Sequence, residues 1–113
     1  MEREPWLGGQ IDMLLLSIIS RGPVHGYALI EQLRLQSRGA FDLPEGTVYP
    51  ALYRLEGLGF LKSEAEKTAG RTRRTYRITR AGSHALSERE ESWRRAVQGI
   101  DAVLKGGAAA SHG

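Results

Sequence analysis

Six basic residues lie between residues 67 and 83 with no acidic residue among them: Lys67, Arg71, Arg73, Arg74, Arg77 and Arg80. The rest of the chain has a net charge of −3, so this segment carries twice the formal net charge of +3 of the whole chain. Clustered lysines and arginines neutralise nucleic-acid phosphates, although a solvated charged face is the simpler alternative. We expect Arg71, Arg73 and Arg74 to contact phosphates. Arg77 and Arg80 are expected to have structural roles.

A second group of residues that could bind nucleic acid lies in EGTVYPALYRLEGLGFL, residues 45–61. Its apolar residues recur at the spacing of one helical face: Val48, Ala51, Leu52, Leu55 and Leu58. The opposite face has small residues and tyrosines in place of the lysines and glutamates of a solvated helix. Tyr49, Tyr53 and the smaller Thr47 can contact thymine methyl groups and phosphate oxygens. Partial burial against the second helix is the alternative for Tyr49, and pairing with an acid is the alternative to phosphate contact for Arg54.

Pro50 falls inside this helical pattern, where a proline loses a backbone hydrogen bond and crowds the preceding turn. If Thr47 caps the helix, Pro50 lies in the first turn and its missing N–H has no consequence. If Asp42 caps it, with Glu45 completing a capping box, Pro50 is interior and leaves the Gly46 carbonyl without a donor. We favour the earlier start, because Asp-x-x-Glu is a definite signal.

A small set of elements has to position these residues. Apolar periodicity predicts helices over residues 10–21 and 25–35, ahead of the helix just described. Strand-like segments follow at residues 62–67 and 72–79, joined by a turn at Thr68-Ala69-Gly70. Three helices followed by a basic hairpin predict an α+β, mostly helical fold, a winged helix-turn-helix.

The hairpin is expected to rest on the helices through Tyr76 and Ile78. Thr79 is a good N-cap for a last helix that runs to about Leu104. The chain therefore divides into four parts: residues 1–9 as an N-terminal arm that includes Trp6, 10–79 as the winged helix-turn-helix, 80–104 as a C-terminal dimerisation helix and 105–113 as a flexible tail.

The last helix has Leu86, Trp93 and Ile100 at intervals of seven, which is more apolar surface than a small monomer core covers. The first helix is also apolar around much of its circumference. We therefore expect two copies to pair through these helices, with this interface: Leu16, Leu86, Trp93, Val97, Ile100 and Leu104. Two-fold symmetry would set the two reading helices one DNA turn apart, about 34 Å.

Composition argues against several other classes of protein. The 113 residues include no cysteine, and the longest apolar run is far shorter than the roughly 20 residues of a membrane span. A cytoplasmic protein without a membrane partner is the default expectation. The histidines at positions 25, 84 and 112 are scattered, and no phosphate-binding loop or nucleophile motif is present. We therefore expect that the chain is not an enzyme, and that it binds no metal ion and no cofactor.

Four motifs resemble the PadR family of bacterial transcriptional regulators in order and spacing: GPVHGYALIEQL (22–33), EGTVYPALYRLEGLGFL (45–61), RRTYRITRAG (73–82) and WRRAVQGIDAVL (93–104). The resemblance covers roughly residues 10–104. His-Gly-Tyr and Gly-Thr-x-Tyr-Pro together make it specific. It implies a homodimeric winged-helix repressor of the short subfamily, which binds a partly palindromic operator.

The same resemblance implies roles for individual residues. It implies that Tyr27, Thr47, Tyr49 and the hairpin arginines lie near DNA. In the family, the residue that matches Trp93 lies at the dimer interface, and in some members paired tryptophans sandwich flat aromatic drugs. Trp93 is therefore either a plain interface anchor or part of a site for a small aromatic or lipophilic effector. The alternative function is a winged-helix protein–protein adaptor, which would not need six bases on its hairpin with no acids.

Overall fold

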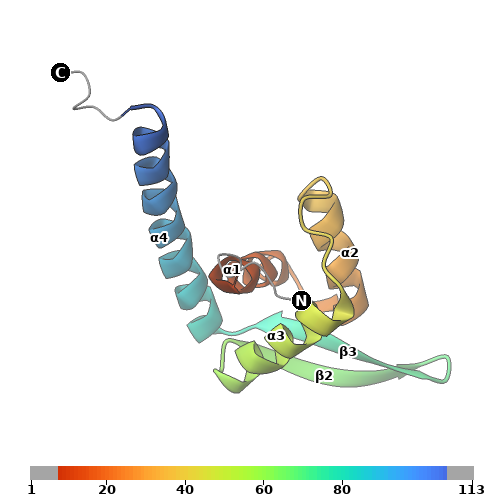
Figure 1. Cartoon of the computed structure of the whole chain (residues 1–113). Helices are drawn as coiled ribbons and strands as arrows, with labels where there is room; N and C mark the ends of the chain where they lie inside the picture. The colour runs from red at the N-terminus through yellow and green to blue at the C-terminus, as the bar shows by residue number, and fades with distance from the viewer. Residues whose placement is uncertain (1–7, 107–113) are drawn as a thin grey trace.

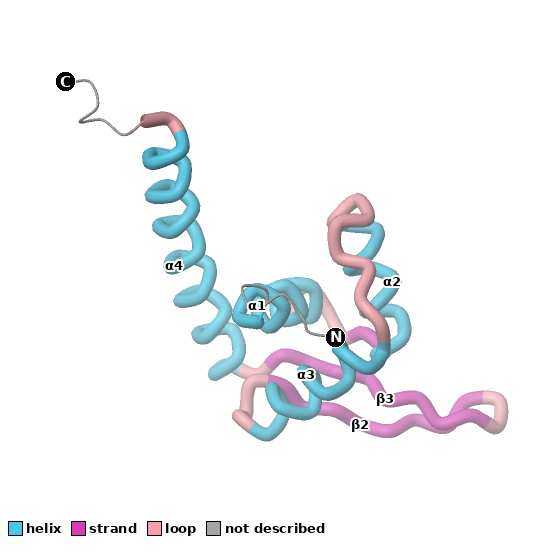
Figure 2. Tube along the Cα trace, in the orientation of Figure 1, coloured by secondary structure: helices cyan, strands magenta, loops and turns pink. Residues whose placement is uncertain are grey.

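The computed structural model describes residues 8–106, which form four helices and a three-stranded antiparallel sheet (Figures 1 and 2). This arrangement confirms the predicted winged helix-turn-helix followed by a long C-terminal helix. Trp6 lies outside the described residues. The elements are α1 (Gly8–Ile19), β1 (Val24–His25), α2 (Gly26–Gln36), α3 (Glu45–Gly57), β2 (Leu61–Thr68), β3 (Arg71–Ile78) and α4 (Arg80–Leu104).

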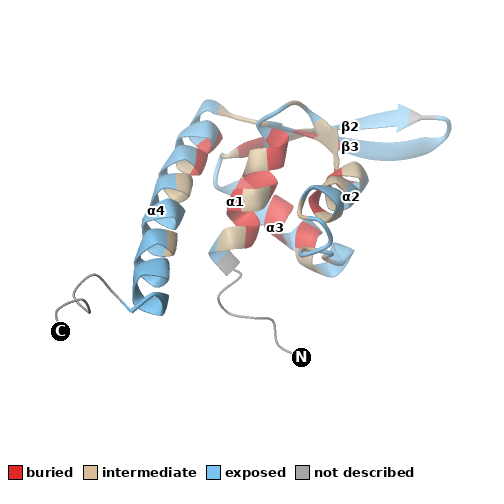
Figure 3. Ribbon diagram, turned by 90° about the horizontal axis from the view of Figure 1, so that it is seen from above, coloured by how far each residue is buried: buried red, intermediate tan, exposed pale blue. Residues whose placement is uncertain are grey.

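The core forms around α1, which lies between α4 on one side and α2 and α3 on the other (Figures 1 and 3). The apolar face predicted for α3 is buried from Val48 to Leu55, whereas Leu58 is 55% exposed because the helix has already ended at Gly57. The largest fully buried side chains are Leu15, Leu16, Ile19, Leu29, Val48, Leu52, Leu55 and Leu61.

Two residues predicted for a dimer interface belong to this internal core instead. Leu16 is 0% exposed and Leu86 is 8% exposed in the single chain. Because α1 is covered by helices on both sides, its apolar stripe is used within the chain, and Leu86 packs the start of α4 onto that core. Neither side chain offers surface to a second copy.

The first turn of α3 begins at a residue that the sequence did not indicate. Its N-cap is Pro44, which has no side-chain capping bond and whose carbonyl accepts the N–H groups of Thr47 (2.9 Å) and Val48 (3.1 Å). The predicted caps, Asp42 and Thr47, are therefore both wrong. A residue that precedes proline is disfavoured in the helical region, so the helix cannot start ahead of Pro44. Pro50 is nevertheless interior, as an early start requires.

The sheet has the order β1-β3-β2, so β3 is its central strand. We refer to residues 61–78, which comprise β2, β3 and their turn, as the wing. The turn consists of Ala69 (φ 52°) and Gly70 (φ 79°), a two-residue loop with both residues in the left-handed region. β1 pairs with the root of β3 in the register Val24↔Tyr76 and His25↔Thr75.

Thr79 caps α4 as predicted, because its Oγ1 accepts the N–H of Gly82 at 3.0 Å. Gly82 itself lies so close to the preceding loop that a Cβ would meet the Phe60 carbonyl oxygen at 2.1 Å. Beyond its first turns α4 extends away from the body (Figure 1) and is largely exposed (Figure 3). Among the helices of residues 8–106, none has both the length and the apolar character needed to cross a membrane.

Candidate nucleic-acid interface

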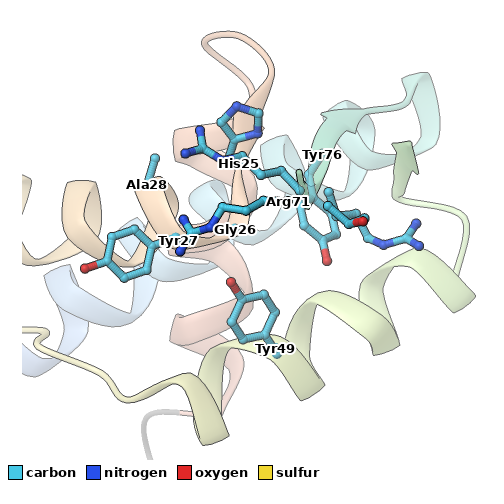
Figure 4. A pocket seen from close by; sticks show the side chains of 10 residues that line it. His25, Gly26, Tyr27, Ala28, Tyr49, Arg71 and Tyr76 are labelled. Carbon is cyan, nitrogen blue, oxygen red and sulfur yellow. The ribbon is translucent and has the colours of Figure 1, made fainter. Parts of the chain in front are cut away.

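A hollow of about 910 Å³ lies between the start of α2, α3 and the wing (Figure 4). We call it the tyrosine–arginine hollow. Five of the eight residues predicted to bind DNA line it, from three separate elements: Tyr27, Tyr49, Arg71, Arg73 and Arg74. The remaining lining residues are His25, Gly26, Ala28, Thr72 and Tyr76. Folding therefore gathers aromatic rings and cations that are up to 47 positions apart, from 27 to 74, on one surface.

The Tyr49 ring lies against the first turn of α2, with its hydroxyl end directed at Gly26 (Figure 4). The side chain is 36% exposed, so its ring contacts the second helix, as the alternative for Tyr49 expected, and also keeps part of its surface in solvent. Burial raises the pKa of the Tyr49 phenol, and the negative charge of Glu45 raises it further. The hydroxyl therefore stays protonated at neutral pH and is able to donate a hydrogen bond.

Tyr53 projects from the next turn of α3 and is 82% exposed. It shares a second hollow with Tyr49 and Arg74. Arg74 donates to Ser63 Oγ at 2.9 Å, and this hydroxyl donates to Glu56 Oε2 at 2.8 Å. A chain of hydrogen bonds thus orients a wing arginine from α3.

The root of the wing is fixed to the helices through Tyr76, which is 5% exposed. Burial raises the pKa of its phenol, while the positive charge of Arg74 acts in the opposite direction. On the neighbouring register pair, Thr75 Oγ1 and His25 Nδ1 form a hydrogen bond of 3.1 Å. The expectation that Tyr76 packs on the helices is confirmed, and His25 joins the start of α2 to the sheet.

The wing is less one-sided in charge than the basic segment suggested. Arg80 belongs to α4, and β2 contributes Glu64 and Glu66 beside the bases. In the register of the hairpin, Glu66 lies opposite Arg73. The wing therefore has six bases and two acids, and the expectation of a hairpin without acids is wrong. The basic segment begins at residue 67, near the end of β2, and so leaves out both glutamates of that strand.

Arg54 and Thr47 line a different hollow, on the flank of α3 that faces α1 and α4. Arg54 Nη2 donates to Asp12 Oδ1 at 2.5 Å, so the alternative of pairing with an acid is what the structure contains. Arg89 of α4 donates to the other carboxylate oxygen, Oδ2, at 3.3 Å. Asp12 was not selected from the sequence, although one carboxylate inside an apolar helical stripe is a usable signal.

A fourth hollow, which we call the α1/α4 groove, has a volume of about 790 Å³. It contains Trp93, which is 39% exposed, and Ile100, which is 55% exposed. Val97 is half-buried, and Leu104 is 78% exposed at the end of α4. The groove is lined by Gly9, Gln10, Met13, Arg89, Ser92, Trp93, Ala96 and Ile100.

Within residues 8–106, no three histidine or acidic side chains lie close enough together to hold a metal ion. His25 bonds Thr75, and His84 pairs with Glu88 one turn later on the exposed face of α4, at 3.3 Å. His112 lies outside the described part of the chain. The chemistry of the described surface is therefore that of aromatic rings, hydroxyls and cations.

Comparisons with known proteins agree with this geometry. The model of the transcriptional regulator PadR-like family matches residues 15–88. Transcriptional regulator Rv3488 of Mycobacterium tuberculosis is 43% identical over 84 residues, which are 74% of this chain and 72% of that protein. A PadR family transcriptional regulator from Eggerthella lenta has 33% identity and a TM-score of 0.79, covering 88% of this chain and 86% of its own. A transcriptional regulator from Clostridium thermocellum has 28% identity and a TM-score of 0.81, and the match covers 87% of this chain and 96% of that chain.

Proposed function

This chain belongs to the PadR-like family of transcriptional regulators, and on that basis we propose that it is a homodimeric repressor that binds a partly palindromic operator. Its relatives are transcriptional regulators and not enzymes. The proposal covers three finer points: the DNA-binding surface, the dimer and the effector. Its place of action would be the cytoplasm, where bacterial DNA lies.

The observation that carries the DNA-binding surface is the tyrosine–arginine hollow. In it, Tyr27 of α2 and Tyr49 of α3 lie on the same side as Arg71, Arg73 and Arg74 of the wing. Tyr27 is 71% exposed, and Tyr53 extends the same surface along α3. Tyrosine rings and hydroxyls suit base edges and sugars, whereas guanidinium groups suit phosphates. We assign α3 to the major groove and the wing to the flanking backbone.

Thr47 remains a candidate for contact with DNA at the N-terminal end of α3, where it is half-buried. Arg54 is assigned differently, because its guanidinium already binds the carboxylate of Asp12. Its contribution to DNA binding would be to hold α3 in place.

The apolar part of α4 supports the dimer. Ile100, Val103 and Leu104 are 55%, 75% and 78% exposed in the single chain, and Trp93 lies about two to three turns before them. A helix of a single chain gains nothing from such a stripe, but a second copy packed against it removes the stripe from water. The proposed interface is thus Trp93, Val97, Ile100 and Leu104, without Leu16 and Leu86.

The α1/α4 groove supports an effector site at Trp93. Its lining combines the indole ring with Met13, Ala96 and Ile100, surfaces on which a flat aromatic or lipophilic molecule can pack. Binding there would change the spacing of the two reading helices and release the operator. Trp93 would then be both an interface residue and a ligand contact.

The deciding experiment is a fluorescence anisotropy titration of the chain with duplex DNA from upstream of its own gene. We expect specific binding that weakens steeply with salt, and a DNase I footprint with two halves about one helical turn apart. Transcription from the same promoter in vitro is expected to fall when the protein is added. A chain that binds no duplex at about 50 mM salt would refute the proposal and favour the protein–protein adaptor.

A further inference from the structure

The carboxylate of Asp12 forms hydrogen bonds with arginines from two different helices, α3 and α4. Oδ1 accepts from Arg54 of α3, and Oδ2 accepts from Arg89 of α4. Asp12 is 7% exposed and belongs to α1, the helix that lies between α3 and α4 (Figure 3). Both oxygens of one buried carboxylate are thus used to join the proposed reading helix to the long C-terminal helix.

This cluster depends on all of its members. A buried carboxylate is strongly unfavourable without cationic partners, and two arginines would repel each other without the carboxylate. Arg89 is held a second time, because its guanidinium lies over the ring of Phe60 at 5.9 Å from the centroid. Phe60 is in the loop that leads from α3 to β2. Arg89 therefore touches α1 and the segment after α3 at once.

The same arginine also borders two hollows. On one side it lines the α1/α4 groove, one helical turn before Trp93. On the other side it lines the hollow formed by Asp12, Thr47, Pro50 and Arg54. A ligand that moves α4 at the groove therefore also moves the Arg89 guanidinium, which contacts Asp12 and Phe60 next to α3.

The N-terminal half of α3 is the part that most needs such support. Its N-cap, Pro44, has no side-chain capping bond, and Pro50 has no N–H to give to the carbonyl of Gly46. With two of the usual helix bonds absent, the first turns depend more than usual on side chains. The Arg54–Asp12 pair joins the C-terminal half of α3 to the core, and so helps to fix the position of the whole helix rather than of its first turns.

We propose that Asp12 and Arg89 are positioning residues that couple the α1/α4 groove to the placement of α3 on DNA. When the groove is filled, Arg89 is displaced from Asp12, and Arg54 is left as the only partner of that carboxylate. The position of α3 changes as a result. This inference rests on the proposed function, since it presumes that α3 binds DNA, but it requires neither a particular operator nor a particular effector.

The absence of cysteine allows the groove to be filled without knowing its ligand. Ser92 lines the groove and is exposed, so Ser92→Cys provides a single thiol there for pyrenyl maleimide. DNA affinity is measured with and without the label in three backgrounds: Arg89, Arg89→Met and Arg95→Met. Arg95 is the matched control, because its 3.3 Å partner, Glu91, is on α4 itself.

With Arg89 present, we expect labelling to change the Kd for DNA by about fivefold or more, within the usual range of allosteric coupling. The ratio of labelled to unlabelled Kd is expected to fall below about twofold in Arg89→Met and to be retained in Arg95→Met. Arg89→Lys, which keeps the charge next to Asp12, is expected to restore part of the ratio. It also provides a folded variant if Arg89→Met is unstable.

Equal ratios in all three backgrounds would overturn the coupling through Arg89, since the label would then act through the dimer or by direct obstruction. A ratio of one with Arg89 intact would also overturn it, while leaving the proposed function untouched. If the unlabelled Ser92→Cys chain and the native chain both fail to bind duplex DNA, the proposed function itself is wrong and this inference falls with it.

Discussion

The ring of Tyr49 occupies the space that a side chain at position 26 would need. A Cβ on Gly26 would lie 2.7 Å from Tyr49 Cε1 and 2.9 Å from its hydroxyl oxygen. Real Cβ atoms do not approach other atoms so closely. Gly26 starts α2 and Tyr49 lies in α3, so the missing side chain at position 26 lets the Tyr49 ring pack directly against the start of α2.

Gly26→Ala is therefore expected to push Tyr49 out of the tyrosine–arginine hollow and to weaken DNA binding by about tenfold, roughly 1.4 kcal/mol. The test is a double-mutant cycle with Tyr49→Ala, measured by anisotropy. In the Tyr49→Ala background, Gly26→Ala is expected to have little further effect. Additive losses would show that Gly26 acts without Tyr49.

The wing arginines are expected to supply affinity that does not depend on DNA sequence. Replacing Arg73 and Arg74 together with alanine should weaken binding to every duplex and lower the slope of log K against log salt by about one to two units. Replacing Arg94 and Arg95 of α4 together with alanine is the control with the same loss of two positive charges, because both side chains are exposed. An unchanged slope in the double variant would remove the wing from the interface.

Thr79 joins α4 to the loop before the wing by two bonds from one hydroxyl. Its Oγ1 accepts from the N–H of Gly82 at 3.0 Å and donates to the carbonyl of Gly59 at 2.6 Å. Thr79→Ala is expected to reduce the free energy of unfolding by about 1–2 kcal/mol in urea titrations. Thr79→Ser keeps the hydroxyl and should retain most of this stability. Equal losses in both variants would argue against the capping role.

Stability is expected to fall in alkaline solution, partly because of Tyr76. Burial raises the pKa of its phenol, so the unfolded chain releases this proton at a lower pH than the folded chain does. The contribution of the protonated Tyr76 phenol to the free energy of unfolding is complete below about pH 10, and it is lost as pH rises through the higher pKa of the folded state. Tyr76→Phe should flatten the alkaline limb of a stability–pH curve. If the stability of Tyr76→Phe falls as steeply with rising pH as that of the native chain, Tyr76 is not the cause of the alkaline loss.

The proposed dimer face can be tested without disturbing the core. Ile100 is 55% exposed in the single chain, so Ile100→Lys places its charge in water unless a second copy covers it. We expect the dimer to dissociate at least about tenfold more readily, because burying an unpaired ammonium is unfavourable. Sedimentation equilibrium measures this, with Gln98→Lys as the exposed control on the same helix. Equal dissociation constants would exclude this face.

The elements that the sequence predicted well depend on local signals. The buried face of α3 follows from the spacing of Val48, Leu52 and Leu55, and the start of α4 follows from Thr79, whose capping partner is three residues away. Such patterns need no knowledge of the rest of the chain. The first turn of α3 was missed because Asp42 and Glu45 fit a capping box, while Pro44 between them prevents the helix from starting there.

The remaining features depend on partners far away in the sequence. Asp12 meets Arg54 and Arg89 across 42 and 77 positions, and no spacing rule reports such a meeting. β1 has only two residues, too few for any periodicity. Leu16 was misassigned because an apolar stripe has the same pattern whether a core or a second copy covers it.

In the strand order β1-β3-β2, the outer side of β2 has no partner along its whole length within the described chain. Along this side, β2 presents eight residues whose backbone could template another strand and start aggregation. Lysines and glutamates occupy half of those positions: Lys62, Glu64, Glu66 and Lys67. Charges of this kind discourage edge-to-edge pairing. The two acids that dilute the charge of the wing thus help to keep an exposed hairpin from joining its neighbours into a continuous sheet.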